Sequence, residues 1–557
     1  MGFQISDKAK KLFYGLIVVG LVLLVVGFFS QKQFLFPEEV NEHHPNELVV
    51  MSNAHGGIDE AAWNGLKDEI KTSFGDNYKV EFRDLLDHTK CTHAPGEHEA
   101  HDGGAHESET DSEKTHAAEH DDGPSFRTRI IVTKLATGGS EEHAHDGGAE
   151  HNHAEHDHGA GADHSEAAHA SGHGHDLSPA ETLHAKFTSG EFSLPDSGFR
   201  RFWSNLLVNG FFFFGIALGA IFYLALHYAT ESGWGVVLLR VMEGIASAMP
   251  MGMVVLAVVF LAGSLGFHHI YSWMDPEAIR ESGDWLGYAK LAYLNTPFFY
   301  IRIICYFSVF LYFTNWFKKT SRREDEEGGV ELHYLMYRRS ALFLIFFAVF
   351  SSTMSWDIIM SIDLHWFSTL FGWYTFSGIW LSAMITIMMI TLYLKGKGAL
   401  EDVNENHIHD VGKWMFALSF LWSYLWFSQF MLTWYSNIPE EVIYFIYRFE
   451  SYSGVFLGMF AINFILPMVF FMSRDTKRSW PYLIVIGMII FIGHWFDVFC
   501  MVMPGTLFEE WEFGLLEIGM FLMFFGGFLL LVFRGLSKAP LVQKNHPFLQ
   551  ESIHHEF

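Results

Sequence analysis

Cysteine is scarce in this chain, which contains only three among its 557 residues: Cys91, Cys305 and Cys500. They lie too far apart in the sequence to form a disulfide framework or to hold an iron–sulfur cluster. The Cys-x-x-Cys-His motif that attaches a c-type haem is also missing. Of the histidines in the apolar runs, only His494 is expected to lie deep, so a b-type haem lacks its paired ligands. We therefore expect this chain to bind no redox cofactor of its own.

Basic residues are also in the minority. The chain has 36 lysines and arginines against 63 aspartates and glutamates, which gives a formal net charge of −27. Most of the acidic excess falls in residues 31–200. A balance of this sign argues against a nucleic-acid partner, because a phosphate backbone attracts positively charged surfaces.

Apolar residues, by contrast, are abundant and occur in ten long runs. Each run is about 18–30 residues long, which is enough for a helix to cross a hydrocarbon core of roughly 30 Å. None of them alternates with a period of two, so helices are favoured over a barrel. The sequence therefore predicts an all-α polytopic membrane protein. Its ten transmembrane helices are expected at 12–30, 203–228, 235–264, 296–317, 340–362, 371–394, 411–436, 452–473, 480–504 and 513–533.

The first run, 12–30, follows Lys8, Lys10 and Lys11, as the apolar segment of a signal peptide would. It is long for such a segment, and no small-x-small cleavage site follows it. We predict an uncleaved transmembrane anchor over residues 1–30. The other nine helices form a membrane domain over 201–535, and residues 536–557 form a C-terminal tail.

Lysines and arginines fall on alternate sides of the apolar runs. One set of connections carries most of them, for example at 318–323 and 474–478. The short connections on the other side hold only Arg280, Lys290 and Arg448. Because positive residues are retained on the cytoplasmic side, both termini are predicted to be cytoplasmic and the segment between the first two helices to be external.

Residues 31–200 form this external insert. Apolar side chains have helical spacing over 58–74, whereas 78–82 and 126–135 have the pattern of strands. We predict a small α+β module that is interrupted by a low-complexity segment rich in histidine, aspartate and glutamate at 91–175.

Seventeen histidines lie between His93 and His184. Neutral imidazole is a ligand for zinc, copper and nickel, but the irregular H-x-H and H-x-x-H spacing lacks a closed set of four ligands. Two interpretations remain: a disordered acidic loop that buffers metal or protons weakly, or a dedicated metal site. The weak candidate ligands are His143, His145, His151, His153, His156 and His158.

Ionisable and polar residues inside the runs fall in two layers, and a charge at such depth normally faces a protein interior or a water-lined path. The outer layer contains Arg302, Asp357, Asp363, His365, Gln429, His494, Asp497 and Glu517. The inner layer contains His227, Arg240 and Glu243. Asp357 has no basic neighbour within one turn of its own helix, so its partner must come from another helix. Arg302 is the candidate.

Two pairs in these layers have i,i+3 spacing, which places both members on one helix face. Arg240 and Glu243 form either a structural ion pair or a relay. His494 and Asp497 form either a structural pair or a proton-transfer pair, because histidine titrates near neutrality.

The segment from Ser355 to Tyr374, SWDIIMSIDLHWFSTLFGWY, resembles the W-D-x-x-x-S…W-x-S-T-x-F…Y signature of the NrfD-like (polysulfide reductase-like) membrane subunits. More closely, it is similar to the second such subunit of bacterial alternative complex III, as are the stretch NLLVN at 205–209 and the ten-helix layout. The resemblance covers roughly residues 1–30 and 200–545. Asp357, Asp363 and His365 fall on its motif.

The resemblance implies two four-helix bundles with two peripheral helices in the bacterial inner membrane. It implies a quinol:cytochrome c, or quinol:oxidase, oxidoreductase in which haem c and iron–sulfur clusters reside on partner subunits. These partners are a multihaem cytochrome c, an iron–sulfur protein and an NrfD-like paralogue that holds the quinol site. Membrane lipid surrounds the chain, quinone or quinol is its possible substrate, and a proton path is its implied contribution. The histidine-rich insert departs from the family pattern.

We hypothesise that Asp357, His494 and Asp497 form an outer cluster that exchanges protons with the external side, while Arg240 and Glu243 guard the cytoplasmic side. A secondary transporter with a histidine-rich, metal-capturing loop is an alternative, although paired metal ligands at the membrane midplane are lacking. A purely structural scaffold is a third. In that case, substitution of Asp357 or His494 would loosen assembly and leave turnover intact.

Overall fold

The computed structural model describes residues 3–29, 46–52, 68, 71–72, 78–84, 126–134, 197–281, 285–508 and 511–556. The chain divides into two compact units. One comprises Met1–Leu35 together with Pro195–Phe557, and the other comprises Phe36–Leu194. Each unit is described by itself.

The smaller unit contains a three-stranded antiparallel sheet with strand order β1-β3-β2. Its strands are β1 (Asn46–Ser52), β2 (Tyr78–Asp84) and β3 (Phe126–Lys134). The central strand, β3, pairs Ile130 with both Leu48 and Phe82, and its run of β-branched residues suits a position between two neighbours. The strands predicted at 78–82 and 126–135 coincide with β2 and β3, whereas β1 was not predicted. The helix predicted over 58–74 and the histidine-rich segment lie almost wholly outside the described residues.

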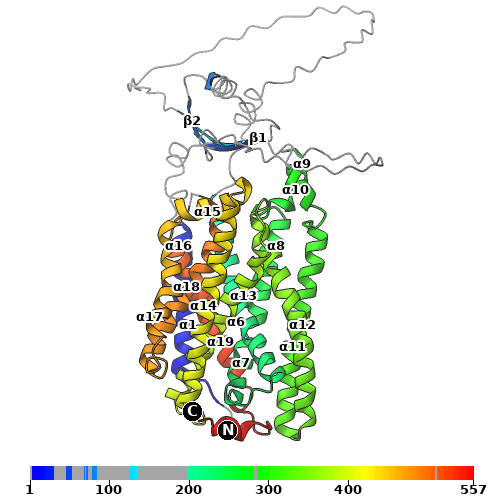
Figure 1. The fold of residues 1–557 in the computed structure, drawn as a ribbon, viewed down its shortest axis with the longest axis vertical. Coiled ribbons are helices and arrows are strands. Elements are labelled where there is room, and N and C mark those ends of the chain that lie inside the picture. Colours follow the sequence, from blue (N-terminus) through cyan, green and yellow to red (C-terminus); the bar gives the residue numbers. More distant parts are fainter. Residues whose placement is uncertain are drawn as a thin grey trace, which may run out of the picture. The chain divides into compact units, whose positions relative to one another are not determined.

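The larger unit is helical (Figure 1). Over the described ranges, ten helices are long and apolar enough to cross a membrane, as the hydropathy pattern predicted. The chain is therefore a multi-pass membrane protein. The helices of these spans are α1 (Asp7–Phe29), α6 (Ser197–Ala229), α7 (Leu239–Ala246) with α8 (Met249–Ser264), α11 (Thr296–Glu327), α12 (Glu331–Ile358), α13 (Leu370–Gly396), α14 (Glu405–Ser436), α16 (Ser453–Phe460) with α17 (Leu466–Phe470), α18 (Trp480–Leu507) and α19 (Leu515–Leu536).

Short helices cap or join the spans. They are the 3₁₀ turns η2 (Val236–Leu238), η3 (Ser272–Met274) and η4 (Met360–Ile362), the α-helices α9 (Pro276–Glu281), α10 (Trp285–Lys290), α15 (Pro439–Glu450) and α20 (Leu549–Ile553), and the π-helical turn η5 (Ala461–Ile465).

Two spans are interrupted where the sequence places an internal proline. Pro250 lies in the first turn of α8, where its missing N–H removes no helical hydrogen bond, and α7 ends just before it. Pro467 lies in the first turn of α17, directly after the π-helical turn η5. Both prolines therefore sit at the start of a new helical segment instead of leaving carbonyl groups unpaired in mid-helix.

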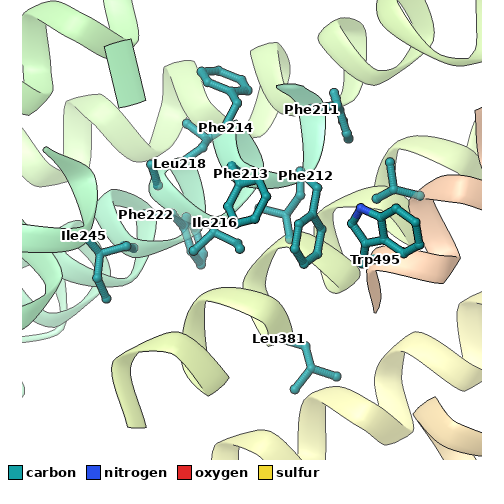
Figure 2. Packing of buried hydrophobic residues seen from close by; sticks show 14 of the residues in the cluster. Phe211, Phe212, Phe213, Phe214, Ile216, Leu218, Phe222, Ile245, Leu381 and Trp495 are labelled. Carbon is teal, nitrogen blue, oxygen red and sulfur yellow. The ribbon is translucent and has the colours of Figure 1, made fainter. Parts of the chain in front are cut away.

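Helix α6 is the centre of the bundle, because it contacts α7, α8, α12, α13, α18 and α19. Consecutive phenylalanines on α6 reach different neighbours, since each residue turns the helix by about 100°. The ring centroid of Phe212 lies 5.2 Å from that of Phe491 on α18, and the ring centroid of Phe213 lies 5.3 Å from that of Phe528 on α19. Figure 2 shows this cluster of buried side chains around α6.

Helices α1 and α19 pack closely through glycines that recur every seven residues, which places them on one face of each helix. A Cβ atom added to Gly20 would lie 2.7 Å from the carbonyl oxygen of Gly519, and one added to Gly519 would lie 2.8 Å from that of Gly20. Gly27 and Gly526 make equally close approaches farther along the same seam.

Both ends of the chain lie at the same end of the helical unit, which we call the terminal face (Figure 1). The tail after α19 is bound along this face. The side chain of Gln543 donates to the hydroxyl of Ser321 on α11, and the side chain of Asn404, which caps α14, donates to the carbonyl of His555.

Candidate functional site

His494 and Asp497 lie together in α18, each with about 1% of its side chain exposed. His494 Nδ1 is 3.6 Å from Asp497 Oδ2, which is too long for a hydrogen bond. The carboxylate is instead held by two other helices. The hydroxyl of Tyr374 on α13 donates to Oδ1, and the indole N–H of Trp422 on α14 donates to Oδ2 at 2.8 Å. Neither ring nitrogen of His494 has a hydrogen-bond partner among the described residues.

A cavity of about 20 Å³ lies beside this pair and is bordered by Thr375, Gly378 and Ser382 on α13. This volume is sufficient for one water molecule. Gly378 keeps the space open, because an added Cβ would lie 3.3 Å from Asp497 Oδ2 and 3.6 Å from His494 Nδ1. The imidazole and the carboxylate therefore border a small cavity inside the bundle whose other walls are mostly apolar.

A second cavity, of about 10 Å³, shares Met501 with the first and is also bordered by Tyr374, Gln429 and Arg448. Arg448 comes from α15, and its side chain is about 2% exposed. Its guanidinium donates to the carbonyls of Cys500 and Met501 at 3.1 and 3.3 Å. These bonds fix a buried positive charge beside the last turns of α18.

Asp363 continues this arrangement toward solvent. Its Oδ2 lies 3.6 Å from Arg448, and a quarter of its side chain is exposed. Burial raises the pKa of the Asp363 carboxyl, while the guanidinium of Arg448 opposes the rise. His494, Asp497, Tyr374, Arg448 and Asp363 thus form a series of polar groups, which we call the α18 polar chain. It runs from the middle of α18 toward the face opposite the terminal face.

Asp357 and Arg302 form a separate, closed unit. Arg302 on α11 makes a bidentate ion pair with Asp357 on α12, with distances of 2.8 and 2.9 Å. The hydroxyl of Tyr306 also donates to Asp357 Oδ2 at 2.9 Å. The predicted partnership of Asp357 with Arg302 is therefore confirmed. No hydrogen bond or ion pair between described residues joins this unit to Asp497, so the outer layer consists of distinct clusters.

Glu517 belongs to a third cluster, at the start of α19. It accepts from Arg201 through both oxygens, at 2.7 and 2.8 Å, and from the side chain of Asn205 at 2.9 Å. Glu517 also accepts from the N–H of Gly514 and so caps its own helix. The cluster joins the first turns of α6 and α19. Its four hydrogen bonds use all the acceptor positions of the Glu517 carboxylate, so none is left for a substrate.

In the inner layer, Arg240 and Glu243 form the predicted ion pair at 2.8 Å. Arg240 also contacts Asp325 of α11, which the sequence did not link to it. His227 is buried in the last turn of α6, and neither of its nitrogens has a hydrogen-bond partner in the described part of the chain. Glu324, His333 and His546 also gather at the terminal face.

The remaining predicted residues divide as follows. Gln429 borders the second cavity, and His365 is half-buried in the connection between α12 and α13, near Asp363. The weak metal candidates, from His143 to His158, lie outside the described residues. Sequence reasoning missed Arg448, which it counted as a loop residue. The apolar side chains of α15 that repeat around Arg448 were the available signal.

No family model matches this chain, and no curated protein matches it in sequence. Chemically, the α18 polar chain contains a histidine and two carboxyl groups that can bind and release protons, together with an arginine that can stabilise an anion.

Proposed function

We propose that this chain is a membrane subunit of a quinol-oxidising respiratory complex of the alternative complex III type, similar to its second NrfD-like subunit (ActF). In this proposal it acts in the bacterial inner membrane as part of a quinol:cytochrome c or quinol:oxidase oxidoreductase. It binds no redox cofactor itself. A multihaem cytochrome c, an iron–sulfur protein and a quinol-binding paralogue are its partners, and they carry the haem c and the iron–sulfur clusters.

The arrangement of helices supports this proposal. Helix α6 contacts α7, α8 and α12, and α12 contacts α11, which fits one four-helix bundle. Helix α13 contacts α14 and α18, and α16 contacts α18, which fits a second. The paired helices α1 and α19 are then the two peripheral ones. With both termini cytoplasmic, residues 31–200 form a periplasmic α+β insert built on the observed sheet.

Proton transfer through the α18 polar chain is the specific role that we propose. The observation that carries it is the buried pair of His494 and Asp497 beside a cavity that can hold water. A histidine whose two nitrogens have no fixed partner can accept a proton at one ring nitrogen and release a proton from the other. Arg448 and Asp363 lie on the same route toward the periplasmic side.

Asp357 suits this role less well than the sequence suggested. Its carboxylate receives three hydrogen bonds, two of which come from the permanent charge of Arg302. The acceptor positions of this carboxylate are thus engaged by donors, and it borders neither of the two cavities described above. We therefore assign Asp357 to the positioning of α11 against α12.

The test compares Asp497→Asn with Asp357→Asn in the purified complex reconstituted in liposomes. We expect Asp497→Asn to lower the number of protons released per electron while the complex stays assembled. We expect Asp357→Asn to lower the yield of the complex without changing this ratio in the part that assembles. An unchanged ratio in Asp497→Asn would exclude the proposed proton path.

Purification of the tagged chain tests the broader assignment. Co-purification with c-haem and iron–sulfur subunits, with quinol oxidation activity, supports the respiratory complex. A colourless chain that is isolated alone and takes up zinc would favour the alternative, a secondary transporter with a histidine-rich external loop. Variants that retain turnover and proton release but assemble poorly would favour a structural scaffold.

A further inference from the structure

Three potential metal ligands meet at the terminal face although they are far apart in the sequence. Glu324 lies in the last turns of α11, His333 lies in the first turn of α12, and His546 lies in the tail. One ligand atom from each lies within 4.8 Å of those of the other two. The exposed fractions of these residues are 1%, 3% and 6%.

The ligand atoms of this cluster have few partners. Neither carboxylate oxygen of Glu324 and neither ring nitrogen of His333 has a hydrogen-bond partner among the described residues. The nearest further carboxylate to His333 is that of Glu231, at 4.0 Å. A buried polar group without a hydrogen bond is costly. Four such atoms in one cluster indicate a common ligand that binds to them.

The tail is fixed in a register that brings His546 to this position. The side chain of Gln543 donates to the hydroxyl of Ser321 at 2.8 Å. The backbone N–H of Lys544 and the side-chain amide of Asn545 donate to Asp325, each at 2.9 Å. These bonds hold the residues before His546 along α11, so the histidine is placed without any help from a ligand.

We propose that Glu324, His333 and His546 form a binding site for a divalent transition metal ion, with Zn²⁺ as the first candidate. Two imidazoles and one carboxylate are a common donor set for Zn²⁺ and leave a fourth position for water or another group. The half-exposed carboxylate of Glu231 is near enough to His333 to supply that group or to orient the ring. This inference is independent of the proposed respiratory function.

The surroundings of His546 are compatible with this site. Its imidazole is buried, with 6% of the residue exposed. The N–H of Phe548 donates to its Nδ1 at 3.2 Å. Its Nε2 has no hydrogen bond to another described residue, so this nitrogen is available to a metal ion.

A metal at this position would join the end of α11, the start of α12 and the tail. Aromatic rings enclose the cluster. The ring centroid of Tyr228 lies 5.7 Å from that of His546, and the ring centroid of Phe548 lies 5.3 Å from that of His333. The role of the metal would therefore be structural. Neither ring belongs to the α18 polar chain. A metal ion bound at this site would therefore strengthen the docking of the tail against α11 and α12.

The test measures zinc bound to the full-length chain after Zn²⁺ is added to EDTA-treated protein and the excess is removed by extensive dialysis against metal-free buffer, with a tag that contains no histidine. Dialysis is essential because histidine-rich sequences such as residues 143–158 are also candidates for metal binding. We expect wild type to retain one more zinc ion per chain than Glu324→Gln or His546→Gln. His554→Gln is the matched control, because His554 is an exposed histidine of the same tail and should retain the ion.

Thermal unfolding provides a second readout. Zn²⁺ should raise the midpoint of EDTA-treated wild type and of His554→Gln, but not that of Glu324→Gln, which keeps the shape of the side chain. Replacement by Co²⁺ should give visible absorption that Glu324→Gln lacks. Equal zinc content in wild type and Glu324→Gln, or a wild-type midpoint that does not respond to Zn²⁺, would refute the site.

Discussion

At the scale of single residues, the carboxylate of Asp357 has three hydrogen bonds and is fully buried. Asp357→Asn leaves the guanidinium of Arg302 buried without a counter-charge. We expect the free energy of unfolding to fall by about 3–5 kcal/mol. The double variant Arg302→Met with Asp357→Leu should recover most of this loss, because neither charge remains.

These values are obtained from unfolding titrations in mixed detergent micelles. Tyr306→Phe serves as the control that removes one hydrogen bond and no charge, and should cost about 1 kcal/mol. A single Asp357→Asn variant that is no less stable than the double variant would show that an uncompensated charge on Arg302 does not cause the loss of stability.

The burial of His268 predicts that the stability of the protein depends on pH. It lies after α8, its Nε2 is 2.9 Å from the carbonyl of Val259, and its Nδ1 accepts from the N–H of Ile270. Burial lowers the pKa of His268 below its ordinary value of 6.5, while the Val259 carbonyl opposes this shift. Its contribution to stability is therefore complete above pH 6.5 and is lost as the pH falls toward the folded-state pKa.

We expect the midpoint of thermal unfolding to decrease between pH 7 and pH 5, and to decrease less in His268→Gln. Glutamine retains a donor for Val259 but cannot take up a proton. His269→Gln is the neighbouring control. If wild type and His268→Gln show the same pH dependence, other groups are responsible for it.

The partners of buried charges were only partly predictable from the sequence. Depth within the apolar runs was enough to pair Arg302 with Asp357, because few other cations lie at that level. Arg201 was missed as the partner of Glu517, since it precedes the apolar run that begins at 203. His546 was missed because nothing in a polar tail indicates which helix it contacts.

At the scale of secondary-structure elements, the glycine seam predicts that α1 is held to α19 by direct backbone contact. Gly519→Leu should separate the two helices, because even a Cβ at this position would lie 2.8 Å from the carbonyl oxygen of Gly20. Gly15→Leu is the matched control, since an added Cβ there meets nothing within 4 Å.

A protease site introduced within residues 31–45 allows this to be measured. After cleavage, the α1 fragment of wild type and of Gly15→Leu should co-purify with the remaining helices in mild detergent. The fragment of Gly519→Leu should be largely lost. Equal retention in all three proteins would mean that contacts outside the seam hold α1.

Hydropathy located the helices but not their ends. The run predicted at 296–317 is the apolar part of α11, which continues to Glu327, and α12 begins at Glu331 instead of 340. These extra turns are polar and project beyond the apolar run, so a hydropathy window cannot include them. Gly328 and Gly329, with φ of 67° and 82°, make the reversal between the two helices.

At the scale of the whole molecule, the tail joins parts of the bundle that are distant in sequence. The hydroxyl of Ser552 in α20 donates to the carbonyl of Trp234 at 2.7 Å, before η2. His555 lies 2.9 Å from Asp410 of α14. Removal of residues 549–557 should therefore loosen α14 from the η2 region without unfolding either.

We expect this deletion to broaden or split the thermal unfolding transition. We also expect it to make the end of α14 at the terminal face susceptible to limited proteolysis. Glu556→Gln, an exposed change in the same tail, should leave both properties unchanged. An intact single transition at the wild-type temperature would show that the tail adds no coupling between the two regions.

The number of membrane-spanning helices and the two strands at 78–84 and 126–134 could be predicted, because both depend on local patterns of apolar residues. The grouping of the helices could not, since lipid-facing and protein-facing residues are similarly apolar in a membrane protein. Arg448 was missed for a different reason, because its segment was counted as a loop and the apolar spacing of α15 was not used.

The position of the tail also bears on how the protein is made. The groups that dock it, among them Gln543 and His555, follow α19 along the chain. The ten membrane-spanning helices of the described residues are therefore synthesised before these bonds at the terminal face can form. A product that stops directly after α19 would contain these ten helices but would lack the contacts that join the tail to α14 and to the η2 region. The bundle must therefore insert into the membrane before its terminal face is complete.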